Sequence, residues 1–200
     1  AAAALQTPVW IIPNGVPIDA APKPVRCNGE RLVIGTAARI NPQKKLEELF
    51  AAVHQAHHRL PPYVLRIAGG VERGCEAYAA QLRQLADGLS VEWIGEVPDT
   101  RQFLHGLDLF AQIAEPSGCP NASLEAMAAG LPVITTDVGG AAEQVEDAVT
   151  GRLVGRGDAD ALAAALVDLA WDRERRTRWG SAGRARATAL FDQNRMVADY

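Results

Sequence analysis

The sequence predicts an α/β fold, a parallel sheet of about six strands with helices on both faces and extra helices toward the carboxyl terminus. One observation is that six short apolar runs alternate with segments in which apolar residues recur at helical spacing. Another is that from about residue 158 onward the pattern is helical only. Because crossovers between parallel strands are right-handed, both faces of the sheet are expected to be covered by helices.

The strands are expected where short runs of mostly apolar residues lie between turn residues. Polar turns follow the runs, and the carboxyl ends of parallel strands meet at one edge of the sheet. The turns are therefore expected to gather at that edge, where folds of this kind bind their ligands. The six expected strands are residues 32–37, 64–68, 91–94, 109–113, 133–135 and 153–154.

Three amphipathic helices are predicted from apolar residues spaced three or four apart. His57 extends the stripe of the first helix, while His54 and His58 flank it. A partly buried histidine beside two surface histidines is therefore expected, and not a metal site. The stripes consist of Leu46, Leu49, Phe50 and Val53, of Tyr78, Leu82 and Leu85, and of Leu162, Leu166 and Leu169.

The composition is typical of one globular domain. With 48% hydrophobic and 22% charged residues, the 200-residue chain can bury a substantial core. A net charge of -4 gives no reason to expect a nucleic acid partner, and no apolar run is long enough for a transmembrane segment. Cys27, Cys75 and Cys119 are odd in number and widely spaced, which favours reduced thiols in a cytoplasmic protein without a zinc site.

Residues 117–134 join a polar turn, a helix and a buried strand, an order that builds an anion site. Asn121 and Ser123 are expected to cap the free amides at the helix start, and Gly130 to take the left-handed conformation after its end. The positive end of the helix dipole then stabilises a phosphate at the turn. Glu125 can accept hydrogen bonds from hydroxyls of the molecule that carries the phosphate.

Two cations favour the same ligand. Arg39 and Lys44 flank the turn Asn41-Pro42, which is expected to bring both side chains to one place. Arginine can bind phosphate oxygens with two parallel hydrogen bonds, and lysine adds a point charge. A diphosphate is therefore the predicted partner of the pair.

These segments, with two others, resemble retaining, nucleotide-sugar-dependent glycosyltransferases of the GT4 type. Residues 124–134 are similar to the second half of the family's E-x7-E region, and the two cations to its R-x4-K pair. Residues 12–16 resemble the turn by which the chain enters the second domain of these enzymes, and residues 136–140 with Glu143 resemble their next loop. The resemblance implies a Rossmann-like sheet that forms one half of a GT-B fold.

The resemblance also implies a role for each part of the site. Glu125 is expected to bind the ribose, and the backbone of Gly95, Glu96 and Val97 to hold the nucleobase. The donor sugar is expected near Glu115, Ser117, Gly139 and Gly140. The family needs no metal or other cofactor, so none is expected. The implied diphosphate-binding residues are Arg39, Lys44, Gly118, Asn121, Ala122 and Ser123.

Two positions depart from the family's pattern. Eight places before Glu125, where the motif has its first glutamate, the chain has Ser117, and the nearest upstream glutamate is Glu115. In the family the first glutamate contacts the donor sugar, so sugar binding is expected to be weakened unless Glu115 replaces it. Lys45 stands where the family usually has glycine.

The resemblance makes the chain a single nucleotide-sugar-binding domain over residues 1–200, the carboxyl-terminal half of such an enzyme. Residues 1–17 are expected to enter from an amino-terminal acceptor-binding domain, and residues from about 190 to 200 to begin a returning helix. Because transfer requires donor and acceptor to be aligned between two domains, the chain alone is expected to bind the nucleoside-diphosphate sugar without efficient turnover.

Three other functions share parts of this pattern. A nucleotide-sugar epimerase of GT-B architecture would share the diphosphate site, although the spacing of Arg39 and Lys44 and the helix of Glu125 favour the transferase. A binding module that has lost catalysis is a third alternative, kept open by Ser117 at the position of the first glutamate. A dinucleotide-dependent oxidoreductase is disfavoured, because residues 35–39 read Gly-Thr-Ala-Ala-Arg where a G-x-G-x-x-G turn is needed.

Overall fold

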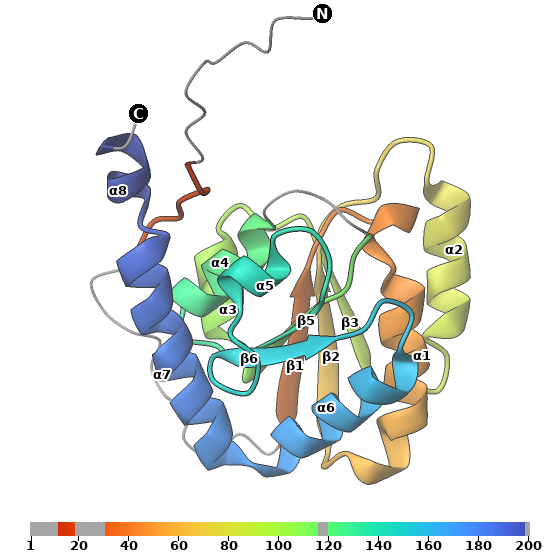
Figure 1. Cartoon of the computed structure of the whole chain (residues 1–200). Helices are drawn as coiled ribbons and strands as arrows, with labels where there is room; N and C mark the ends of the chain where they lie inside the picture. Colours follow the sequence, from red (N-terminus) through yellow and green to blue (C-terminus); the bar gives the residue numbers. More distant parts are fainter. Residues whose placement is uncertain (1–11, 19–30, 116–119, 199–200) are drawn as a thin grey trace, which may run out of the picture.

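The computed structural model describes residues 12–18, 31–115 and 120–198, and shows one six-stranded parallel sheet (Figure 1). The strand order is β3-β2-β1-β4-β5-β6. All six predicted strands are confirmed, with their ends shifted by no more than two residues. Cys27, Ser117, Gly118 and Cys119 lie outside the described residues. The strands are β1 Leu32–Ala37, β2 Tyr63–Ala68, β3 Val91–Gly95, β4 Leu109–Gln112, β5 Val133–Thr136 and β6 Gly151–Val154.

Helices cover both faces of the sheet, as predicted. One face packs against α1 Leu46–Ala56, α2 Glu76–Leu85 and α6 Ala159–Trp171, and the other against α3 Thr100–His105 and α4 Asn121–Ala128. Neighbouring strand residues alternate between the two cores, because successive side chains of a strand point to opposite faces. In β1, for example, Val33 belongs to the α4 side and Ile34 to the α1 side, and both are fully buried.

The long helix α7, Arg173–Leu190, contacts β6, α4 and α6, and so closes the β6 end of the sheet (Figure 1). Its contact with α4 is unusually close. A Cβ atom added to Gly180 would lie 2.1 Å from the carbonyl oxygen of Gly130. Gly130 has φ +78, so the prediction of a left-handed residue after the α4 helix is confirmed. The two glycines therefore let one backbone cross directly over the other.

The first described segment lies beside the end of α7 and the short helix α8, Gln193–Ala198 (Figure 1). The amide of Val16 donates to the carbonyl of Phe191 at 2.8 Å, and its own carbonyl accepts from Gln193 at 3.0 Å. Val16 and Phe191 are both buried in the core on the α4 side. Residues 12–18, the stem, therefore pair with the segment that joins α7 to α8.

Two further predictions concern single side chains. His57 is partly buried and makes a 2.9 Å hydrogen bond with the hydroxyl of Tyr63, while His54 and His58 are exposed, as predicted. Cys75 is a free thiol. Within the described ranges, no helix has both the length and the apolar character needed to cross a membrane.

Candidate functional site

A pocket of about 380 Å³ lies at the carboxyl ends of β1 and β4. Four of the predicted diphosphate residues line it together: Arg39, Lys44, Asn121 and Ala122. The expectation that the turn after β1 and the start of α4 meet at this edge of the sheet is therefore confirmed. The remaining lining residues are Thr36, Ala37, Ala38, Gln112, Ile113 and Pro120.

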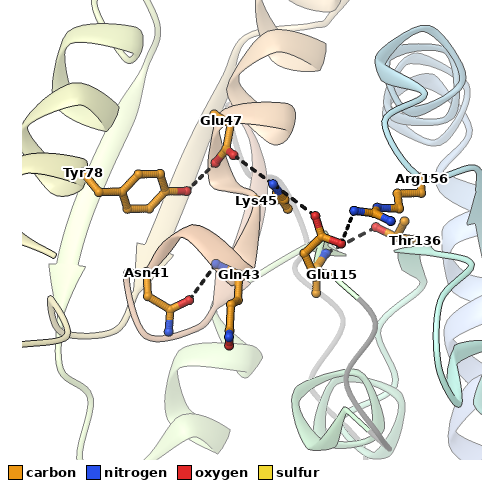
Figure 2. Close-up of polar contacts among 9 residues, drawn as sticks. Asn41, Gln43, Lys45, Glu47, Tyr78, Glu115, Thr136 and Arg156 are labelled. Carbon is orange, nitrogen blue, oxygen red and sulfur yellow. Dashed lines mark hydrogen bonds and ion pairs between the residues drawn. The ribbon is translucent and has the colours of Figure 1, made fainter.

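The turn between β1 and α1 positions the two cations. It is one turn of 3-10 helix, Pro42–Lys44, whose start is capped by the Asn41 Oδ1 atom accepting from the Gln43 amide at 3.0 Å (Figure 2). This cap fixes the loop that separates Arg39 from Lys44, so the two side chains reach the same pocket.

Glu72 holds the Arg39 side of the turn. Its Oε2 atom lies 3.2 Å from Nη1 of Arg39 and accepts a 2.6 Å hydrogen bond from Nδ2 of Asn41. The Arg39 side chain is 71% exposed, so most of this side chain remains accessible to a ligand.

The start of α4 differs from the prediction, because neither Asn121 nor Ser123 caps it. The cap position is Pro120, which offers no side-chain cap hydrogen bond, so Asn121 and Ser123 already lie inside the helix. Asn121 Oδ1 instead accepts from Nδ2 of Asn14 at 3.0 Å. The Ser123 hydroxyl is fully buried and donates to Oε1 of Gln112 at 2.9 Å. Within the described ranges, the cap residue offers no side-chain acceptor to the first amides of α4, which is the arrangement that a bound anion uses.

Glu115 lies outside the pocket lining, between two cations (Figure 2). Its carboxylate oxygens lie 3.1 Å from Nζ of Lys45 and 2.5 Å from Nη2 of Arg156. The hydrogen bond from Lys45, with a second from Arg156, lowers the pKa of the Glu115 carboxyl, and the same contact raises the pKa of Lys45. The Glu115 amide also donates to the carbonyl of Gln43 at 2.9 Å. Glu115 therefore ties together the turns after β1, β4 and β6.

Glu47 extends this network toward α2. It lies 3.8 Å from the Lys45 ammonium and accepts a hydrogen bond from the Tyr78 hydroxyl (Figure 2). Burial, followed by the contact with Glu47, raises the pKa of Tyr78. Lys45 itself has φ 47, the left-handed region that glycine adopts without strain. The backbone at this position therefore has the left-handed conformation typical of glycine, the residue that the family usually has here, although this chain has lysine.

None of the described residues predicted for the nucleobase or the sugar lines the pocket. Apart from Glu115, which follows β4, they lie at the turns after β3 and β5. Gly95 ends β3 with φ +74, and its carbonyl accepts from Gly69 at 2.7 Å. Glu96 lies against Gly70, since a Cβ there would be 2.5 Å from its carboxylate. Val97 follows in the same turn. Gly139, with φ +57, and Gly140 lie between β5 and α5, Ala141–Gln144, and Glu125 is partly buried on α4.

Sequence reasoning missed Gln112 as a site residue. It ends β4, lines the pocket and is only 9% exposed. The signal was available, because Gln112 is the one polar residue in the predicted strand 109–113. A polar side chain in a strand buried on both faces needs a hydrogen-bond partner, and so indicates a specific role.

Comparison with known proteins agrees with the fold and with the family that the sequence resembles. The family model described as "Glycosyl transferases group 1" matches residues 18–186. A GDP-mannose-dependent monoacylated alpha-(1-6)-phosphatidylinositol monomannoside mannosyltransferase of Corynebacterium glutamicum is 35% identical over 78% of this chain and 42% of its own length. An alpha-maltose-1-phosphate synthase of Mycolicibacterium smegmatis is 30% identical over 94% of this chain and 51% of its own length.

Solved structures show the same architecture. HepE of Anabaena, solved in complex with UDP and glucose, has a TM-score of 0.78 and 27% identity over 84% of this chain and 46% of its own. The sucrose-phosphate synthase of Thermosynechococcus elongatus has a TM-score of 0.82 and 25% identity over 94% of this chain and 49% of its own. The chain thus spans about half the length of the relatives that it matches. It has the Rossmann-like sheet of one half of a GT-B glycosyltransferase and belongs to the glycosyl transferases group 1 family.

Proposed function

We propose that this domain binds a nucleoside-diphosphate sugar and serves as the donor-binding half of a retaining glycosyltransferase. One observation carries the proposal. Arg39, Lys44 and the start of α4, where Pro120 provides no side-chain cap, surround one pocket at the carboxyl edge of the sheet. Two cations and a helix amino end are complementary to a diphosphate, and this edge is where such sheets bind nucleotides.

The same groups have a chemical role in transfer. When the bond between the sugar and the diphosphate breaks, negative charge grows on the departing phosphate oxygen. Arg39 and Lys44 lie where they can stabilise that charge, and the uncapped amides of α4 add fixed dipoles. This machinery needs no metal, since the cations replace the charge that a metal would supply.

The rest of the donor is assigned to the neighbouring turns. We assign the ribose to Glu125, the nucleobase to the turn of Gly95, Glu96 and Val97, and the sugar to the side of Gly139 and Gly140. All of these follow strands of the same sheet or lie on α4. Relatives named for GDP-mannose and structures solved with UDP support a nucleoside-diphosphate donor without deciding which base this chain prefers.

The acceptor is assigned to a second domain. The relatives are about twice as long as this chain, and retaining transfer requires both substrates to be held in one geometry. We therefore expect the domain alone to bind the donor and to transfer its sugar inefficiently.

A thermal-shift panel tests the proposal. The whole chain is melted with UDP, GDP, ADP, CMP and NAD, and with UDP-glucose and GDP-mannose. A ligand at about 100 times its dissociation constant stabilises the native state by roughly 2.7 kcal/mol, or about 5 to 10 °C for a domain of this size. One nucleoside diphosphate is expected to give such a shift. No shift with any diphosphate, or a larger shift with NAD, would contradict the proposal.

A further inference from the structure

Gln112 is a buried polar side chain at the end of an otherwise apolar strand. It is 9% exposed, and the other β4 residue on the same face, Phe110, is fully buried in the core on the α4 side. Placing an amide in that layer is unfavourable unless its polar atoms find partners. Gln112 also lines the pocket between Arg39 and the start of α4. Its amide therefore lies where the core meets the candidate ligand site.

One half of this amide has a partner in the protein. Ser123, fully buried in the first turn of α4, donates its hydroxyl hydrogen to Oε1 of Gln112 at 2.9 Å. The carbonyl oxygen and the amide nitrogen of glutamine lie on opposite sides of the same carbon atom. Holding Oε1 against Ser123 therefore turns Nε2 away from the core.

The other half has no partner among the described residues, because no acceptor there receives a hydrogen bond from Nε2. The pocket is the region that Gln112 faces apart from the core. The Arg39 guanidinium, the Lys44 ammonium and the first amides of α4 are donors as well. The lining also contains the hydroxyl of Thr36 and the amide of Asn121, both of which can donate, and the Oδ1 atom of Asn121 already accepts from Asn14. A ligand rich in acceptor oxygens would satisfy all of them.

We propose that Gln112 is a ligand-binding residue that donates a hydrogen bond from Nε2 to an oxygen of the bound diphosphate. Ser123 is the corresponding positioning residue, which fixes the amide with its nitrogen toward the pocket. This inference rests on the proposed nucleotide function and extends it with a neutral donor, which holds a phosphate oxygen without adding charge. Ser123 then orients the Gln112 amide, whereas the sequence predicted that it would cap α4.

Substitutions at Gln112 test the donor directly. Gln112→Met keeps the volume and removes the amide, and is expected to weaken diphosphate binding roughly three- to tenfold. Gln112→Glu keeps an acceptor for Ser123 but places an oxygen where Nε2 was, so a loss of about tenfold or more is expected from repulsion. Affinities of the whole chain are measured by titration calorimetry with UDP against uridine and with GDP against guanosine. The nucleosides are expected to bind as they do to the wild type.

Ser123→Ala tests the positioning role. Because the free amide can then rotate, a smaller loss of diphosphate affinity is expected, again without loss of nucleoside affinity. In the double variant Gln112→Met with Ser123→Ala, the serine has no amide left to orient, so the loss is expected to equal that of Gln112→Met alone. Gln84→Glu, an exposed glutamine on α2, is the control for the change of charge and is expected to change nothing.

Each outcome decides the inference. If Gln112→Glu fails to fold, Gln112→Met and Ser123→Ala decide. Equal losses for nucleoside and diphosphate, or no loss with Gln112→Met, would show that the pair only fills the core. If Arg39→Ala weakens the diphosphate while the Gln112 variants do not, the proposed function stands and this inference is wrong. If the wild type binds no diphosphate, both are wrong.

Discussion

Lys45 and Glu115 form a 3.1 Å ion pair that joins the start of α1 to the segment after β4. The lysine makes this contact from a left-handed backbone position, and the glutamate shares its other oxygen with Arg156. Lys45, which stands where the family's pattern has glycine, thus contacts the glutamate nearest upstream of the motif's first position.

The melting temperature of the Glu115→Gln variant is expected to depend less on pH in the acid range than that of the wild type. Because Lys45 and Arg156 lower the pKa of Glu115, the stabilisation is present above the ordinary value of 4.5 and is lost as pH falls through the lower folded-state pKa. The variant has no such stabilisation to lose. Its melting temperature should therefore lie below that of the wild type near neutral pH and approach it below pH 4.5. Asp87→Asn, at an exposed carboxylate outside the network, is the control, and parallel curves for Glu115→Gln and the wild type would count against the idea.

Lys45→Gly is expected to be more stable than Lys45→Ala by about 1 kcal/mol. Both variants lose the ion pair, but only glycine adopts φ 47 without the cost of a Cβ atom. Chemical denaturation measures the difference. At Gln55, an exposed position within α1, the order should reverse, since alanine is the better residue inside a helix by about 1 kcal/mol. If alanine were the more stable residue at position 45 as well, the backbone there would not be strained.

Gly180→Ala is expected to destabilise the domain by roughly 1 to 3 kcal/mol. The new methyl group would lie 2.1 Å from the Gly130 carbonyl oxygen, and backbone atoms cannot move aside easily. Gly183→Ala on the same helix is the matched control. Its nearest contact would be Met127 at 3.6 Å, so the better helix propensity of alanine should leave stability unchanged or raise it by up to about 1 kcal/mol. Equal effects of the two substitutions in denaturant melts would mean that α7 does not lie as close to α4.

Arg39→Ala and Lys44→Ala are each expected to weaken nucleoside diphosphate binding by roughly ten- to a hundredfold. This corresponds to about 1.5 to 3 kcal/mol for hydrogen bonds to charged groups. Nucleoside binding, titrated alongside, should change little, because the proposed partners are phosphate oxygens. Arg178→Ala, at an exposed arginine of α7, controls for the loss of one positive charge. If the affinities for the nucleoside and the nucleoside diphosphate fell by the same factor, the substitutions would have disturbed the fold and not a phosphate contact.

Glu125→Gln is expected to weaken a nucleoside diphosphate and its sugar conjugate by the same factor, since a ribose contact is common to both. Glu115→Gln provides the contrast: a contact with the sugar would weaken the conjugate alone. Titration of both variants with UDP and UDP-glucose, and with GDP and GDP-mannose, separates the two roles. If Glu125→Gln affected the conjugate only, its assignment to the ribose would be wrong.

Much of the fold followed from local pattern. Runs such as 32–37 predicted their strands because buried parallel strands are continuously apolar, and the alternation with helices predicted the order of layers. The pocket also followed, because the rule that ligands bind beyond the carboxyl ends of strands needs only the strands and the turns. Arg39 and Lys44 were placed together by a five-residue spacing, which a local turn can satisfy.

The remaining features depend on contacts that no local rule supplies. Asn121 and Ser123 are good capping residues, but the helix begins at Asn121, and a shift of one or two residues moves a cap into the first turn. Ser123 was then free to bond with Gln112, eleven residues earlier. The pairing of Glu115 with Lys45 and Arg156 joins three separate turns, and sequence spacing gives no measure of such distances.

The stem, residues 12–18, is also mechanically coupled to the pocket. The two hydrogen bonds of Val16 join the stem to the segment between α7 and α8. Asn14, also on the stem, donates a hydrogen bond to Asn121 at the rim of the pocket. A displacement of the stem is therefore transmitted to the edge of the sheet where the pocket lies. Because Asn121 is the first residue of α4, a twist of the stem is transmitted through the Asn14–Asn121 hydrogen bond to the helix start that borders the pocket.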